Sequence, residues 1–103
     1  MNRFPLVILC LLFLAVFASC TKIENAWLLI KADTAYNQGN FPKAIDLYKK
    51  IIEANPEGAD LHWKLGIAYF SNNEKENVKK EIAQLRRLGK KDMANDLEHL
   101  LNK

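Results

Sequence analysis

The sequence predicts an all-α protein, built from antiparallel helix pairs of a short α-solenoid with a C-terminal capping helix and preceded by an N-terminal signal helix. Three observations lead to this fold class. Within residues 20–103, apolar residues recur three and four positions apart, which is the spacing of one helix face. Glycine and proline fall at the ends of these stripes, as at Gly39 and Pro56. No segment alternates between apolar and polar residues for long enough to form a strand.

Five apolar stripes define the expected helices. They span, in order, Trp27–Tyr36, Phe41–Ile52, Leu61–Tyr69, Val78–Leu88 and Met93–Leu101. Breaks that contain glycine fall at Gly39, within residues 55–58 and at Gly89. Pro42 lies just inside the start of the second helix, where a proline is tolerated because the N–H that it lacks would have no helical partner.

Composition argues against catalysis. The chain has 103 residues, 50% of them apolar, which leaves room for one domain once a targeting segment is removed. It has two Cys and two His, whereas a catalytic zinc site needs about three protein ligands. His62 and His99 have no cysteine or paired carboxylates at ligand spacing, and there is no glycine-rich phosphate loop. We therefore expect no enzyme, no metal, no cofactor and no small-molecule substrate.

The N-terminus has the pattern of an export signal. Arg3 precedes thirteen uninterrupted apolar residues, Leu6–Ala18. This length fits the apolar region of a signal peptide, about 7–15 residues, and falls short of the roughly 18 that a membrane span needs. Residues 1–19 are therefore predicted to be a signal peptide.

The end of this segment resembles the bacterial lipobox. Ala18 and Ser19 precede Cys20 as the two small residues of that motif, whereas Phe17 stands where an aliphatic residue is usual. The resemblance implies cleavage before Cys20, acylation of Cys20 (with palmitate among the expected acyl groups), and lipid anchoring in a bacterial cell envelope. The alternative is an uncleaved anchor helix in which Cys20 is an ordinary interfacial residue. Because no acidic residue directly follows Cys20, analogy with sorting rules favours the outer membrane, facing the periplasm. Residues 20–24 would be a tether.

The part that follows contains an internal repeat. Ala32 in the first helix recurs as Gly66 in the third, a period of 34 residues. The pattern Ala32-x-x-Ala35-Tyr36-x-x-Gly39-Asn40-Phe41-x-x-Ala44-Ile45-x-x-Tyr48-x-x-Ile51, ending at Pro56, resembles the tetratricopeptide (TPR) repeat. The domain 25–103 is thus predicted to hold one repeat at 25–58, a degenerate repeat at 59–89 and a cap helix at 90–103. In the second repeat, Asn73 and Val78 replace the expected Gly and Ala.

The TPR resemblance also implies a binding groove. In that family the first helix of each pair lines a concave face, which here would place together Leu29, Asp33, Tyr36, Asn37, Trp63, Ile67, Phe70 and Ser71. An apolar groove of this kind suits a short hydrophobic peptide or an amphipathic helix. The alternative is that these residues pack against the C-terminal helix. Members that clamp acidic tails carry Lys and Asn where this chain has Ala32, Tyr36, Gly66 and Phe70, so that ligand class is not expected.

Basic residues cluster towards the C-terminus. The possible basic patch consists of Lys79, Lys80, Arg86, Arg87 and Lys90. Such a patch could face anionic lipid headgroups or an acidic partner. A solvated helix face is the reading that we prefer, because Lys and Arg are common on outer helices.

Together these features predict a membrane-anchored envelope lipoprotein that acts as a TPR interaction and scaffold module. Its partner would be another envelope protein or peptide. Nucleic acid is not expected for an exported chain with a small net charge. The alternative function is a self-associating structural envelope protein, whose groove is filled by its own helix or by a neighbouring copy.

Overall fold

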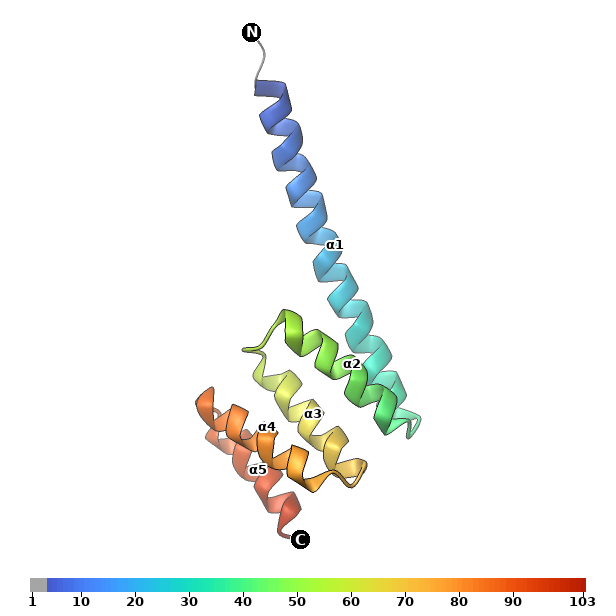
Figure 1. Cartoon of the computed structure of the whole chain (residues 1–103), viewed down its shortest axis with the longest axis vertical. Helices are drawn as coiled ribbons and strands as arrows, with labels where there is room; N and C mark the ends of the chain where they lie inside the picture. Colours follow the sequence, from blue (N-terminus) through green and yellow to red (C-terminus); the bar gives the residue numbers. More distant parts are fainter. Residues whose placement is uncertain (1–3) are drawn as a thin grey trace.

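A computed structural model describes the backbone of residues 4–103 and the side chains of residues 7–12 and 25–103. This part of the chain forms five helices and no strand, so the predicted all-α class is confirmed. The helices are α1 (Phe4–Asn37), α2 (Phe41–Ala54), α3 (Ala59–Ser71), α4 (Lys75–Arg87) and α5 (Lys91–Leu101), and they are shown in Figure 1.

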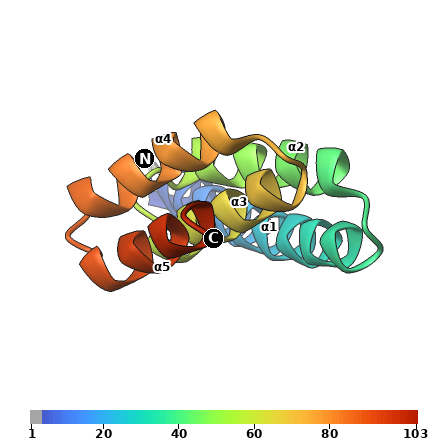
Figure 2. The ribbon, with the colours of Figure 1, turned by 90° about the horizontal axis from the view of Figure 1, so that it is seen from below.

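The helices stack in chain order. Each packs against the next, and α3 also contacts α5. Seen end-on in Figure 2, α2 and α4 form one layer, and α1, α3 and α5 form the other. This is the alternation of a solenoid of helix pairs, in which α5 occupies the place of a fifth, capping helix. The predicted short TPR-like array is therefore confirmed at the level of the fold.

Helix α1 is longer than its role in the array requires. Its N-terminal part extends beyond the other helices (Figure 1), and the apolar side chains of residues 7–12 are exposed. The predicted signal peptide, from Phe4 onwards, and the predicted tether at residues 20–24 fall within this one helix. The side chain of Cys20 lies outside those that the structure describes. Among the residues whose placement is described, no helix combines the length and apolar character needed to cross a membrane.

Three of the turns between helices share one geometry. Gly39, Asn73 and Gly89 all have a left-handed backbone, with φ of 78°, 63° and 76°. In each turn the next N–H donates to the carbonyl five residues back, as in a Schellman motif: Asn40 to Ala35 (2.9 Å), Glu74 to Tyr69 (2.9 Å) and Lys90 to Leu85 (2.8 Å). Asn73 lies 34 residues after Gly39, and Asn is the residue that best replaces Gly in this conformation. The degenerate repeat thus has the same turn with asparagine in place of glycine.

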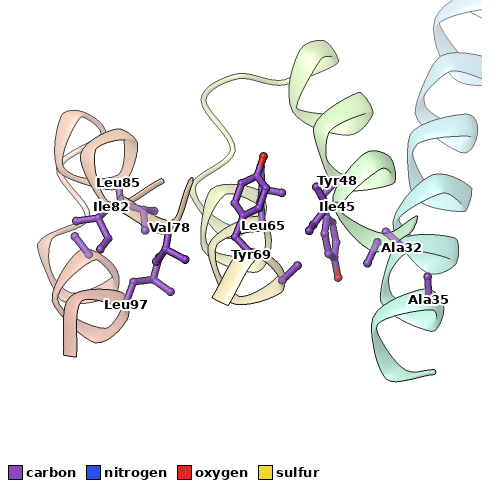
Figure 3. Close-up of a cluster of buried hydrophobic side chains, with 13 residues drawn as sticks. Ala32, Ala35, Ile45, Tyr48, Leu65, Tyr69, Val78, Ile82, Leu85 and Leu97 are labelled. Atoms are coloured by element: carbon purple, nitrogen blue, oxygen red, sulfur yellow. The ribbon is translucent and has the colours of Figure 1, made fainter. Parts of the chain in front are cut away.

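The core follows the repeat. Buried side chains from all five helices form one row along the stack, which Figure 3 shows from Ala32 to Leu97. Ala44 and its repeat equivalent Val78 are both 0% exposed, so the larger valine is accommodated at the same kind of helix contact. A Cβ atom added to Gly66 would lie 2.5 Å from Cδ1 of Leu97. Gly66 therefore allows the close approach of α5 to α3.

A buried polar pair joins α3 to α4. Nδ1 of His62 lies 2.6 Å from Oε2 of Glu81, and Nε2 donates to the carbonyl of Pro56 at 2.8 Å. Both side chains are buried. Burial raises the pKa of Glu81, and the hydrogen bond with His62 opposes this rise. Through these two contacts, His62 connects the α2–α3 linker to α3 and α4.

Candidate functional site

The layer of α1, α3 and α5 is hollowed by a cavity of about 910 Å³. Residues from all three helices line it, together with the end of α2 and the α2–α3 linker. Its larger apolar residues are Leu29, Ile51, Leu61, Trp63 and Met93. Exposed charged residues also line it, namely Glu57, Asp60, Lys90 and Asp96. An apolar surface edged by charges is the usual composition of a protein-binding site.

A second cavity, of about 460 Å³, adjoins the first along α1 and α3. The two share Trp63 and Lys64, and the second adds Asp33, Tyr36, Asn37, Tyr48 and Ile67. We call the two cavities together the concave groove. It runs along the face formed by the first helix of each pair.

Trp63 is the central aromatic residue of the concave groove. It is half-buried, packs against the core cluster and borders both cavities. In the larger cavity it is accompanied by Leu29 of α1 and Met93 of α5. Helix α5 therefore forms one wall of the groove and leaves Trp63 partly open to solvent.

Polar contacts connect the helices that surround the smaller cavity. Nζ of Lys64 lies 3.0 Å from Oδ2 of Asp33, and the hydroxyl of Tyr48 donates to the other oxygen of Asp33. Burial, and then the hydrogen bond to Asp33, raise the pKa of Tyr48. These bonds tie α1 to α2 and α3. The carboxylate of Asp33 already accepts hydrogen bonds from two donors. Asp33 therefore stabilises the shape of the groove and has less capacity to bind a ligand directly.

The structure brings together most of the residues that the resemblance placed on the concave face. Leu29, Asp33, Tyr36, Asn37, Trp63 and Ile67 line the concave groove. Phe70 lines neither cavity and lies half-buried against the core. Ser71 also lines neither cavity, and its hydroxyl is 3.0 Å from that of Tyr36.

Sequence reasoning missed the contribution of α5. Lys90, Met93 and Asp96 line the larger cavity, and Lys64 lines both cavities. The signal was present in the repeat itself. A cap that follows two helix pairs occupies the place of a further first helix, and the first helix of each pair was the one predicted to line the concave face.

The possible basic patch lies on α4 and at the start of α5. Most of its members have acidic partners in the described part of the chain: Lys79 with Glu76 (3.1 Å), Arg86 with Glu98 (2.5 Å) and Arg87 with Glu57 (3.4 Å). All of these pairs are about half exposed or more, so each contributes little to stability. The pairing reduces the positive charge that the patch presents to a partner.

Comparison with known proteins supports the repeat. A family model described as a TPR repeat matches residues 32–73, which begin at Ala32 and end at the turn residue Asn73. No curated protein and no solved structure gives a significant match. The match covers the last turns of α1, all of α2 and all of α3. TPR repeats are typically non-catalytic modules that bind proteins, and the match indicates a protein-interaction module here.

Proposed function

We propose that this chain is a lipid-anchored protein of the bacterial envelope, whose concave groove holds a short apolar or amphipathic segment of another envelope protein. The observation that carries the binding role is the partly open Trp63 at the centre of a groove lined by α1, α3 and α5. A tryptophan in such a position is the residue type that most often dominates binding energy. The TPR match over residues 32–73 supports a protein as the ligand.

The anchor rests on the sequence. Ala18, Ser19 and Cys20 resemble the lipobox, and Thr21 rather than an acidic residue follows, which supports an outer-membrane destination facing the periplasm. Two or more acyl chains on one cysteine would hold the protein stably on a bilayer, since each buried CH₂ contributes about 0.8 kcal/mol.

The binding role is tested by photocrosslinking in intact cells. A photoreactive amino acid replaces Ile67 in the groove, and a matched variant carries it in place of Lys50, which is exposed on α2. We expect a defined protein to be captured from position 67 and not from position 50. Adding Trp63→Ala to the position 67 variant should abolish that capture. Equal capture from both positions would contradict a groove-based function, and capture of a second copy of this chain would favour the self-associating alternative.

The anchor is tested by the intact mass of protein extracted from membranes. We expect a chain that begins at Cys20 and carries acyl groups, and an uncut precursor for Cys20→Ser. A wild-type mass equal to that of the unmodified 103-residue chain would refute acylation.

A further inference from the structure

The outer face of α1 carries the exposed large hydrophobic residues of the helical array. Within residues 25–103, these are Trp27 and Ile30, each 58% exposed. Both lie on the side of α1 away from Ala32 and Ala35, which face the core. Figure 1 shows the remaining helices on one side of α1 only. The outer face therefore has no partner in the described part of the chain.

The chemistry of this face is that of a membrane interface. Nζ of Lys31 lies 5.8 Å from the centre of a Trp27 ring, so an aromatic ring and a cation sit together beside an aliphatic side chain. Tryptophan is enriched at the level of lipid headgroups, where one end of its ring is apolar and the other is wet. Lysine beside it can reach anionic headgroups while its stem covers apolar surface.

We propose that the outer face of α1, defined by Trp27, Ile30 and Lys31, lies against the surface of a phospholipid bilayer. This inference rests on the acylated Cys20 of the proposed function. It adds that the axis of α1 lies parallel to the membrane surface and not perpendicular to it.

The position of the anchor in α1 selects the bilayer as the occupant. Cys20 precedes Trp27 by seven residues, which is about two helical turns, so the two positions share one face of α1. They are separated by about 10 Å along the axis, and Ile30 is about 15 Å from position 20. The headgroup layer is only about 5–8 Å deep. An upright helix would therefore leave Ile30 in water, whereas a helix lying on its outer face places both side chains in the interface.

A second copy of the chain fits this face less well. Stacking end to end would require a complementary apolar surface on the second copy. Outside the concave groove, which the proposed function assigns to another protein, residues 25–103 expose no large hydrophobic side chains elsewhere. Pairing through two α1 outer faces would bring together two large hydrophobic side chains from each copy, Trp27 and Ile30. A standard stable interface involves about 20–30 residues and roughly 800 Å² per partner.

The test compares two neighbouring residues, which lie at nearly the same point along the axis of α1 but on different faces of the helix. The full chain is purified from membranes and reconstituted into vesicles of phosphatidylethanolamine and phosphatidylglycerol that contain lipids brominated near the headgroup. In a background of Trp27→Phe and Trp63→Phe, one variant carries Ile30→Trp on the outer face and the other carries Leu29→Trp on the groove face. Circular dichroism confirms that both variants remain helical.

We expect the bromolipid to reduce the emission of Ile30→Trp by about twofold and to leave that of Leu29→Trp nearly unchanged. The native Trp27, as the single tryptophan in Trp63→Phe, should be quenched like position 30. Equal quenching at positions 29 and 30 in protein that floats with the vesicles would overturn the inference alone and leave the proposed function intact. Disulfide formation between copies of an Ile30→Cys variant on vesicles, with no quenching at position 30, would assign the face to a second copy instead. Protein that does not float with the vesicles would overturn both this inference and the proposed anchor.

Discussion

Leu97 is a buried residue through which α5 packs against α3. It is fully buried and lies against Gly66 of α3. Replacing such a leucine by alanine costs about 2–5 kcal/mol, because the transfer free energy of the side chain is lost and a cavity remains. A domain of this size has a free energy of unfolding of only about 4–12 kcal/mol. Leu97→Ala should therefore remove a large share of the stability of residues 21–103, and the loss of 3 kcal/mol would lower Tm by roughly 12–24 °C.

Gly66→Ala supplies the second arm of a double-mutant cycle. In the wild-type background the added Cβ meets Leu97, and overpacking of this kind costs about 1–3 kcal/mol, partly offset by about 1 kcal/mol of helix propensity. In the Leu97→Ala background the obstacle is gone, so Gly66→Ala should become neutral or stabilising. Urea and thermal unfolding followed by circular dichroism give the four free energies, with the exposed Asn95→Ala as the control. Additive effects of the two changes would refute the contact between α3 and α5.

The remaining predictions concern the core, the buried pair and the groove. Ala44→Leu should cost about 1–3 kcal/mol, because Ala44 is 0% exposed, whereas Lys43→Leu at an exposed position should leave Tm nearly unchanged; equal shifts would mean that α2 is in a different register. The folded-state pKa of Glu81 lies above the ordinary value of 4.5, so the native state keeps a proton that the unfolded state releases, and stability falls as pH rises above that value. Between pH 5 and pH 8, the Tm of wild type should therefore fall relative to the Tm of Glu81→Gln. A constant difference between the two Tm values would contradict this reasoning. Trp63→Ala should keep a cooperative melting transition, because Trp63 is only half-buried in the wall of the groove; loss of the helical signal at room temperature would make it a core residue.

The fold could be predicted because the packing of consecutive helix pairs follows from local sequence patterns. The 34-residue spacing from Ala32 to Gly66, and the breaks near Gly39 and Gly89, follow from helix geometry and turn chemistry. The sequence does not show in the same way that Asn73 keeps the turn of Gly39, since a left-handed asparagine is one of several conformations open to that residue.

The groove could be predicted only in part. Residues of α1 and α3 were found because the resemblance assigns the first helix of each pair to the concave face. Met93 was missed because α5 was predicted as a terminal cap, or in the alternative as a helix that covers the groove residues, and not as one of the walls of the groove. The pair of His62 and Glu81 was missed for a different reason: the two residues are nineteen positions apart, and their contact depends on the packing of α3 on α4 rather than on any spacing within one helix.

The stacking of each helix on its neighbours in sequence has a consequence for how the chain folds. The main contacts join consecutive helices, and the longest step, from α3 to α5, passes over a single helix. Such a low contact order favours folding in microseconds to milliseconds. Helix pairs can form in order from the N-terminus, because each helix needs only the next one in sequence as its partner. The groove, however, is complete only when α5 arrives, since Lys90, Met93 and Asp96 form its last wall. If the groove is the binding site, as proposed, the chain can bind a partner only after its last helix is in place, and binding then reports that the whole array has folded.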